Sequence, residues 1–206
     1  MIKICGVILS AGASSRMGRD KALLPWPPGA ADSTMLSASI AALGPYCVAV
    51  VVVAGRNANN LASAIAAGGA AMVVNPEPER GQFSSMQIGL RQALALGCEA
   101  AMITLVDNPP LSAASMKRLR TAFDEALGRG HWGVAPERGG RRGHPLLVNL
   151  DLIDALLSAP VDSNAREVKR AHPGTIEAVP VPDSLVSVDV NTPGEYAALV
   201  VDEAGR

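Results

Sequence analysis

The sequence is poor in aromatic residues and lacks a hydrophobic run long enough to cross a membrane. Phe, Trp and Tyr make up 3% of the 206 residues, so aliphatic side chains and alanine must form the core. No apolar run reaches the roughly 20 residues of a membrane-spanning helix. The N-terminus runs directly into a strand-like segment without the regions of a signal peptide. We therefore expect a cytoplasmic protein that does not interact with a membrane.

An excess of one charge is also lacking, and cysteine is rare. The 18 Lys and Arg residues nearly balance the 19 Asp and Glu residues, which leaves a net charge of −1 at pH 7. This balance excludes the strongly basic surface that is typical of nucleic-acid-binding proteins. The cysteines are Cys5, Cys47 and Cys98, an odd number without metal-ligand spacing, which indicates a reducing compartment rather than a disulfide framework. We expect them to act as small buried hydrophobic residues.

Strand-like and helix-like segments alternate along the chain, and residues 1–206 are long enough for one substantial core. After a first strand over 2–9, the patterns predict strands over 48–54, 71–74, 100–106, 132–136, 145–149 and 186–190. They predict helices over 57–67, 84–96, 112–127 and from Thr192 to about 203. This order predicts a single α/β domain with three layers, a Rossmann-like arrangement with a mostly parallel mixed sheet. Ligands of such sheets bind at the carboxyl ends of the strands.

The first strand ends in a loop with the composition of an anion-binding turn. Gly12 and Gly18 have no side chain to block close backbone approach. Exposed N–H groups in such a turn bind anions, and Arg16 and Lys21 add positive charge. The loop has neither the P-loop pattern nor the three-glycine dinucleotide pattern. It therefore predicts a distinct triphosphate-binding loop, the alternative being an ordinary strand-to-helix turn with solvated basic residues.

The string LSAGASSRMGRDKALLPW over residues 9–26 resembles the N-terminal signature of the molybdenum cofactor cytidylyltransferase and guanylyltransferase-like NTP transferases. The resemblance implies a nucleotidyltransferase fold in which Arg16 and Lys21 are catalytic. It also implies a nucleotide-binding set consisting of Leu9, Ser10, Ala11 and Gly12. Ser10 stands where the cytidylyltransferases usually have Ala. The guanylyltransferases more often have two adjacent glycines at the position of Ala11 and Gly12, which favours cytosine as the base.

Two acidic segments are candidates for a Mg²⁺ site. Asp107 follows the apolar run at 100–106, and a carboxylate is a hard oxygen ligand suited to Mg²⁺. The related enzymes have an Asp-x-Pro string here with the Asp on the metal, and Gln or Met is commoner at the position of Asn108. The alternative role for Asp107 is a cap ahead of Ser112. Asp189 lies in a looser version of the relatives' late motif, so Asp189 or Asn191 completes the metal site, with Asp189 favoured for its charge.

The segment from Asn75 to Leu90 resembles the part of the related proteins that contacts the base and ribose. It implies a nucleotide-binding role for Asn75, Gly81, Ser84 and Ser85. Small hydroxyl residues at a helix start leave N–H groups free for a ligand. Simple N-capping by Ser84 is the alternative, and the two roles are compatible.

A basic turn over 138–142 precedes a Gly-His-Pro string that the relatives share, which points to Arg142 and His144 as acceptor-binding residues. Downstream, the string from Asp162 to Arg166 resembles the relatives' Asp-x-Gly-Ala-Arg, with Asn164 at the Gly position, where Asn tolerates positive φ. The alternative is a helix start capped by Asp162 or Ser163.

These resemblances together imply a reaction that joins CMP from CTP to the phosphate of a molybdopterin-type cofactor with release of pyrophosphate. The implied partners are a nucleoside triphosphate, a phosphorylated pterin acceptor and, transiently, a molybdoenzyme or its chaperone. Three alternatives stay open: GTP as the nucleotide, a sugar or alcohol phosphate as the acceptor, and a non-catalytic carrier of nucleotide or cofactor.

Overall fold

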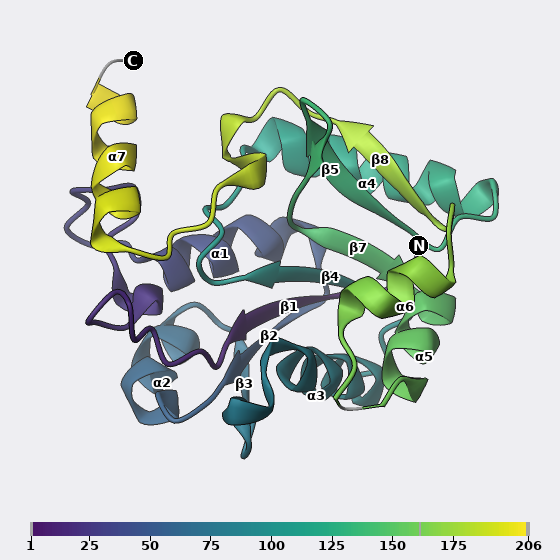
Figure 1. Ribbon diagram of the computed structural model, residues 1–206, viewed down its shortest axis with the longest axis horizontal. Helices are drawn as coiled ribbons and strands as arrows, with labels where there is room; N and C mark the ends of the chain where they lie inside the picture. Colours follow the sequence, from purple (N-terminus) through teal and green to yellow (C-terminus); the bar gives the residue numbers. More distant parts are fainter. Residues whose placement is uncertain (1, 161, 205–206) are drawn as a thin grey trace.

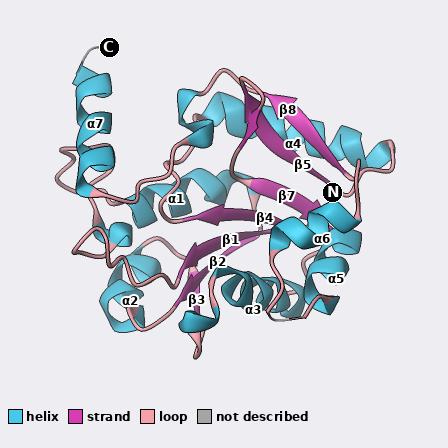
Figure 2. Ribbon diagram, viewed as in Figure 1, coloured by secondary structure: helices cyan, strands magenta, loops and turns pink. Residues whose placement is uncertain are grey.

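The computed structural model describes residues 2–160 and 162–204, and an eight-stranded sheet forms its centre (Figures 1 and 2). The strands are β1 (Ile4–Ser10), β2 (Ala49–Ala54), β3 (Ala71–Val74), β4 (Ala100–Leu105), β5 (Gly133–Arg138), β6 (Arg141–Arg142), β7 (Leu146–Asn149) and β8 (Ile176–Pro180). Their order is β3-β2-β1-β4-β7-β5-β6, with β8 paired to β5. The strands β3, β2, β1 and β4 are parallel, and β7 is antiparallel to both β4 and β5. The expected mostly parallel mixed sheet is confirmed.

Helices cover both faces of this sheet and give it three layers. They are α1 (Met35–Leu43), α2 (Ala58–Ala67), α3 (Gln82–Ala95), α4 (Ala113–Gly128), α5 (Leu150–Ser158), α6 (Ala165–Ala171) and α7 (Pro193–Ala204). One core cluster packs α1, α2 and α4 on one face, and a second packs α3, α5 and α6 on the other. The helix α7 stands at the end of the molecule, beside the loop that follows β1 (Figure 1). A small third cluster lies there, made of Met17, Leu24, Trp26, Met35 and Val190.

The sequence of β2 shows why these strands form a buried sheet. Its residues AVVVVA are buried from Val50 onward, as expected of a parallel strand covered on both faces. On the α3 side, Gly89 allows the helix to approach the sheet closely. A Cβ atom at Gly89 would lie 2.5 Å from Val7 and 2.9 Å from Val53, so no larger residue fits without a shift. This close packing brings the start of α3 to the carboxyl edge of β1.

Most of the expected elements are confirmed within a few residues, including the final helix, whose first residue is Pro193. The strand expected over 186–190 is wrong. This segment contains a short 3-10 helix, η4 (Ser184–Ser187), and then an extended link. Its buried Val186 and Val190 anchor the link to two different core clusters, so the apolar alternation reflects anchoring and not strand pairing. The pattern also missed β6, β8, α1 and α5, and it gave the helix start at α6 (Ala165–Ala171) only as an alternative.

Two smaller expectations also have clear outcomes. Asn164 has φ of −144° and caps α6 by accepting from the backbone N–H groups of Arg166 and Glu167, so a positive φ and capping by Asp162 or Ser163 are both wrong. Cys5 and Cys98 are buried as expected, whereas Cys47 is only half-buried. Burial raises the pKa of Cys5 to about 12. Among the described residues, no helix is both long and apolar enough to cross a membrane.

Candidate active site

A cavity of about 300 Å³ opens at the carboxyl edge of β1 and β4, where ligands of open α/β sheets bind. One wall is the loop after β1, a second is the turn after β4, and the third is the start of α3. The lining residues from these walls include Leu9, Ser10, Ala11, Gly12, Ser14, Lys21, Gly81, Ser85, Val106 and Asp107. The fold thus gathers most of the predicted nucleotide-binding residues around one cavity.

Lys21 is the centre of the charged network in this cavity. Its Nζ atom lies 2.9 Å from Oδ2 of Asp107 and donates a second hydrogen bond of 2.8 Å to Oδ1 of Asn191. The η1 segment (Lys21–Leu23) holds this lysine, because the Asp20 side chain caps it by accepting from Ala22 N–H. The predicted catalytic pair Lys21 and Asp107 is therefore in contact.

Arg16 reaches the same network from the exposed side of the loop. Its Nη2 atom donates to Oδ1 of Asn191 at 3.2 Å, so one amide oxygen accepts from both loop cations. The backbone of Asn191 is fixed by Glu195, whose carboxylate accepts from the N–H groups of Asn191 and Thr192 at 2.8 Å. The hydrogen bond from Glu195 N–H to Thr192 Oγ1 completes a capping box, with Thr192 as the N-cap of α7. These N–H groups hold the pKa of Glu195 below its usual value.

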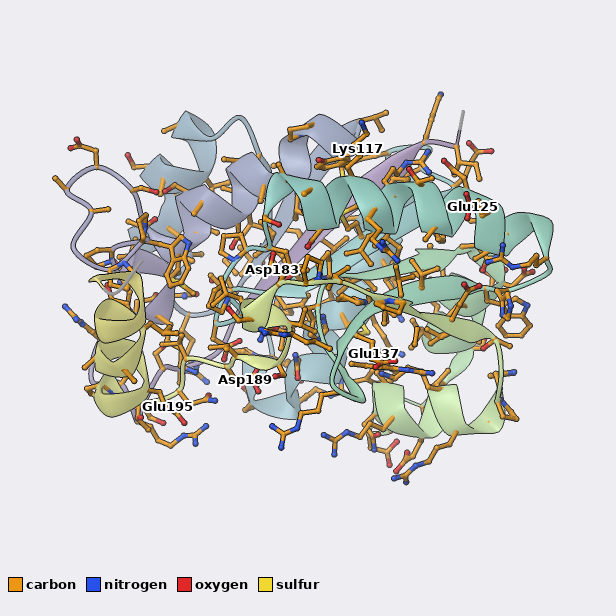
Figure 3. The ribbon with its side chains drawn as sticks, turned by 90° about the horizontal axis from the view of Figure 1, so that it is seen from above. Lys117, Glu125, Glu137, Asp183, Asp189 and Glu195 are labelled. Carbon is orange, nitrogen blue, oxygen red and sulfur yellow. The ribbon has the colours of Figure 1, made fainter. Side chains whose placement is uncertain are left out.

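Asp189 lies on the link between η4 and α7 (Figure 3). Its Oδ1 atom accepts from Asn108 Nδ2 at 2.5 Å. A backbone hydrogen bond of 2.9 Å from Val190 N–H to Asp107 C=O joins the same two segments. The two predicted metal ligands are thus on adjacent segments, joined by Asn108.

These two carboxylates have the oxygen chemistry that Mg²⁺ prefers. The hydrogen bonds among described residues engage one oxygen of each, Oδ2 of Asp107 and Oδ1 of Asp189, which leaves the second oxygen available. Within residues 2–160 and 162–204, no group of three His, Cys, Asp or Glu side chains is arranged to hold a metal. The arrangement fits a cation that keeps waters and takes its remaining ligands from a substrate phosphate.

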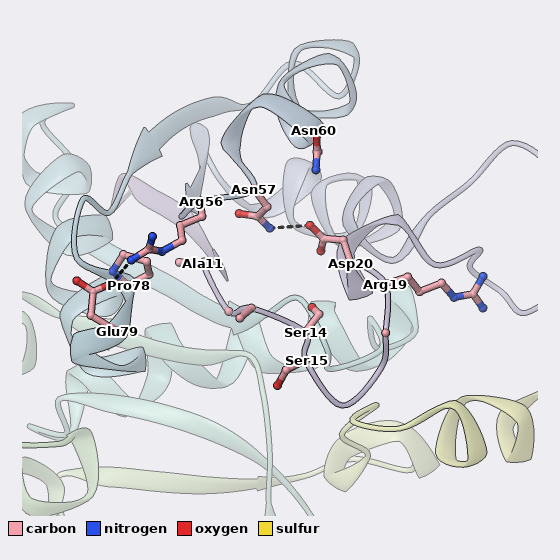
Figure 4. A pocket seen from close by; sticks show the side chains of 13 residues that line it. Ala11, Ser14, Ser15, Arg19, Asp20, Arg56, Asn57, Asn60, Pro78 and Glu79 are labelled. Carbon is pink, nitrogen blue, oxygen red and sulfur yellow. Dashed lines mark hydrogen bonds and ion pairs between the residues drawn. The ribbon is translucent and has the colours of Figure 1, made fainter.

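A second cavity of about 590 Å³ adjoins the first and shares Ala11, Gly12 and Ser14 with it (Figure 4). Its outer wall is an exposed ion pair between Arg56 and Glu79, with N and O atoms 3.2 Å apart. Its inner wall carries Asn57, at the start of α2.

Asn57 holds the loop after β1 in place through two hydrogen bonds, and a third, to Gly55, anchors Asn57 itself. Its Nδ2 atom donates to Oδ2 of Asp20 at 2.7 Å and to the Ser10 carbonyl at 3.0 Å. Its Oδ1 atom accepts from Gly55 N–H at 3.0 Å. The loop is therefore fixed at both ends before any ligand binds.

The predicted base-side residues divide into two groups. Gly81 and Ser85 line the smaller cavity, and Gly81 caps α3 with a φ of 90°, a conformation that favours glycine. Asn75 and Ser84 lie beneath it and are 2% and 6% exposed. Asn75 Nδ2 donates to the hydroxyls of Ser84 and Ser85 at 2.9 Å, so these side chains support the cavity floor.

The acceptor candidates Arg142 and His144 lie farther along, on β6 and just before β7. The Nδ1 atom of His144 is 3.2 Å from the Ile103 carbonyl, and burial lowers the pKa of this imidazole. Lys169 of α6 lies near Arg142 and Arg166, and burial together with these two cations lowers its pKa. In the described part of the chain, none of these three cations has a carboxylate within ion-pair distance. Lys169, Arg166 and the predicted Arg142 thus form a cluster of cations without a carboxylate partner in the described part of the chain.

Three contributors to the site were not found from the sequence: Asn57, Lys169 and the amide of Asn191 as the partner of Lys21. Asn57 and Lys169 belong to no motif, because their partners are distant in the chain. The sequence singled out Asn191 as a candidate metal ligand, whereas in the structure its amide oxygen accepts from Lys21. Its position two residues after Asp189 indicated only that both could lie on one side of the link.

Comparisons with known proteins agree with this geometry. The family model of the MobA-like NTP transferase domain matches residues 6–176. The chain is 26% identical over 191 residues to a molybdenum cofactor cytidylyltransferase of Escherichia coli K12, covering 92% of each chain. It is 30% identical over 206 residues to a molybdenum cofactor guanylyltransferase of Rhodobacter capsulatus, covering 95% of this chain and 94% of the other. It is also 30% identical over 193 residues to a nicotine blue oxidoreductase of Paenarthrobacter nicotinovorans, covering 92% of each.

Solved structures share the fold. A nucleotidyl transferase from Methanothermobacter matches with a TM-score of 0.78 at 23% identity, over 98% of this chain and 97% of that one. A Mycobacterium tuberculosis H37Rv protein in complex with manganese matches with a TM-score of 0.70 at 24% identity, over 97% and 98%. With a cavity at the carboxyl edge, a glycine loop with two cations, and a family model over most of its length, the chain belongs to the MobA-like NTP transferase domain family.

Proposed function

We propose that this chain transfers CMP from CTP to the phosphate of a molybdopterin-type cofactor and releases pyrophosphate. The observation that carries the proposal is the contact of Lys21 with Asp107, 2.9 Å apart, on the wall of a cavity lined by the glycine loop. The names of the cytidylyltransferase and guanylyltransferase relatives support molybdenum cofactor as the acceptor.

The chemistry requires positioning and charge stabilisation more than proton transfer. An acceptor phosphate oxygen attacks the α-phosphorus of the nucleotide, and the bond from that phosphorus to the bridging oxygen of the leaving pyrophosphate breaks. A phosphate monoester is already largely ionised at neutral pH, since its second pKa is about 6. A general base is therefore not needed, and the depressed pKa of His144 fits a role in orientation.

The loop residues stabilise the charge that develops on the leaving group. Arg16 and Lys21 converge on Asn191 in the free chain, and Lys21 lines the smaller cavity. Fixed cations and backbone N–H groups that are already oriented stabilise such charge without reorganisation. Asp107 and Asp189 would hold Mg²⁺, which supplies charge neutralisation of the triphosphate when it is bound.

The choice of CTP rests on the turn residues Ala11 and Gly12, since a methyl group at Ala11 differs from the two adjacent glycines of the guanylyl relatives. The alternative nucleotide is GTP, which leaves the mechanism unchanged. We further propose a cytoplasmic reaction and transient transfer of the product to a molybdoenzyme or its chaperone.

The experiment that tests the function is pyrophosphate release with Mg²⁺ and molybdenum cofactor, measured separately with CTP, GTP and ATP. Release with CTP alone is the expected result, and a preference for GTP would overturn the base assignment only. Tight nucleotide binding without release, for every phosphorylated acceptor tried, would contradict catalysis and favour the carrier. The matched negative control is Asp107→Asn, which keeps the size of the side chain.

A further inference from the structure

Asn108 joins the two acidic segments of the site. It follows Asp107 directly and is 7% exposed. Its Nδ2 atom donates to Oδ1 of Asp189 at 2.5 Å and to the Val188 carbonyl at 3.1 Å. With the backbone bond from Val190 N–H to the Asp107 carbonyl, three hydrogen bonds connect the turn after β4 to the link into α7.

The orientation of the Asn108 amide follows from its surroundings. The reversed amide would place Oδ1 against the Asp189 carboxylate and the Val188 carbonyl, and two acceptors repel each other. In the orientation present, Oδ1 is buried and has no hydrogen-bond partner among the described residues. A buried acceptor without a partner is destabilising, so the contribution of this side chain comes from its donor end.

The Asp189 carboxylate needs such a partner because it lies on an exposed link without strand pairing. Val186 and Val190 anchor the backbone on each side of it, but neither contact fixes the side chain. Among the described residues, Asp189 accepts a hydrogen bond from one side-chain donor, Asn108. Without that donor, the carboxylate is free to rotate toward solvent.

We propose that Asn108 is a positioning residue that orients Asp189 toward Asp107 and thereby sets the affinity of the divalent-cation site. The inference rests on the proposed role of the two carboxylates as metal ligands. Residues that hydrogen-bond to metal ligands typically contribute about 10- to 100-fold to metal affinity. Asn108 acts through Asp189 and does not itself coordinate the cation.

The test measures the dissociation constant of Mn²⁺ alone by electron paramagnetic resonance, without nucleotide or acceptor. Asn108→Leu removes the donor at similar volume, and Asn108→Ser is a smaller second variant in case the first does not fold. Asp189→Asn defines the affinity that remains when the ligand charge is lost. Asn149→Ala is the matched control, because Asn149 caps α5 at the opposite edge of the sheet and its loss affects stability only.

The expected result is Mn²⁺ binding that is about 10-fold weaker in the Asn108 variants, with Asn149→Ala unchanged. In turnover, the apparent KM for the metal rises while kcat at saturating metal stays near the wild-type value. Wild-type Mn²⁺ affinity in a folded Asn108 variant would overturn the inference. Equal Mn²⁺ affinity of the wild-type chain and the Asp189→Asn variant would overturn it as well. A lower Tm without a change in Mn²⁺ affinity would show a purely structural residue.

The outcomes for this inference and for the proposed function are separable. A chain that binds Mn²⁺ through Asp189 and Asn108 but releases no pyrophosphate would contradict the function and retain the positioning role. If the wild-type chain transfers nucleotide and the Asn108→Leu variant binds Mn²⁺ with normal affinity, the function would be retained and the positioning role contradicted.

Discussion

The Nζ atom of Lys21 lies 2.9 Å from Oδ2 of Asp107, although the two residues are 86 positions apart in the chain. Their side chains are 12% and 23% exposed, so the ion pair is only partly screened by solvent. Removing one partner of such a pair leaves the other charge uncompensated. In the free chain each residue therefore compensates the charge of the other. Under the proposed mechanism, substrate phosphates would take over the contact with Lys21 and a cation the contact with Asp107.

Replacing Lys21 by Ala is expected to lower turnover and to strengthen metal binding in the absence of nucleotide. Turnover falls by on the order of 10²-fold or more, as it does when one preorganised stabilising group is removed. Mn²⁺ binding to the free chain tightens because Asp107 loses its competing cation. Pyrophosphate release and Mn²⁺ titration measure the two effects, and Lys117→Ala on α4 is the matched control. Near-normal turnover in both Lys21→Ala and Asp107→Ala would contradict the mechanism.

Asn191→Ala is expected to lower turnover by about 10-fold or more, because Arg16 and Lys21 lose the acceptor they share. Hydrogen bonds to charged groups contribute roughly 1.5–3 kcal/mol each. Asn191→Asp retains an acceptor and should keep more activity than Ala. If Asn191→Asp had lower turnover than Asn191→Ala at saturating metal, the oxygen shared by Arg16 and Lys21 would not be the feature of Asn191 that supports turnover.

Gly12→Ala is expected to raise KM for the nucleotide without lowering Tm. A Cβ atom at Gly12 meets nothing within 4 Å in the free chain, so it interferes only with a ligand that approaches the loop closely. Gly55→Ala is the contrasting variant, since its Cβ would lie 2.7 Å from the Ala11 carbonyl and should destabilise the fold. Thermal unfolding measures the Tm of both variants, and steady-state kinetics measures their KM for the nucleotide. Unchanged nucleotide KM in Gly12→Ala would place the phosphates elsewhere.

Lys169→Ala is expected to raise KM for the phosphorylated acceptor by about 10-fold or more, with KM for the nucleotide nearly unchanged. Burial and the neighbouring Arg142 and Arg166 disfavour the positive charge of Lys169 in the free chain. A bound anion would stabilise that charge, so the cluster favours anion binding. Arg118→Ala on α4 removes a cation of the opposite side of the molecule and serves as the control. A rise in nucleotide KM of equal size would assign the cluster to the triphosphate instead.

His144 predicts a pH dependence of stability. Burial lowers the pKa of the folded imidazole below its ordinary 6.5, so the unfolded chain binds the proton first as the pH falls. Stability contributed by neutral His144 is thus fully present above about pH 6.5 and decreases from there toward the lower folded pKa. His144→Asn should flatten the dependence of Tm on pH between pH 7.5 and 5.5. Parallel curves for the two proteins would contradict the depressed pKa.

The central part of the fold is predictable from the sequence because it depends on local patterns. The valine run of β2 and the apolar run ahead of Asp107 identify buried strands by composition alone. The link at 186–190 alternates valine with polar residues, as a half-buried strand does, but it pairs with no strand among the described residues, since tertiary anchoring of Val186 and Val190 replaces pairing. Local sequence cannot distinguish these two uses of alternating valines.

The sequence predicts which residues of the candidate site belong to motifs, but it predicts few of the contacts between these residues. Lys21 and Asp107 were identified from short strings, but the contacts of Lys21 with Asn191 and of Asn108 with Asp189 join segments far apart in the chain. Ser84 illustrates the same limit, because its position at a helix start suggested ligand contact while its hydroxyl faces Asn75. Pairings of this kind depend on topology that no single segment encodes.

The third apolar cluster has a consequence for how the protein matures. It packs Met17, Leu24 and Trp26 against Val190, and Tyr196 of α7 donates to the Pro25 carbonyl across 171 positions. The ribosome makes the loop after β1 well before Asn191, which accepts from Arg16 and Lys21 of that loop across 175 and 170 positions. Nascent chains that stop before Asn191 should therefore form the sheet but leave Arg16 and Lys21 without this acceptor, so the charged network assembles only after residues 189–196 have packed against the loop.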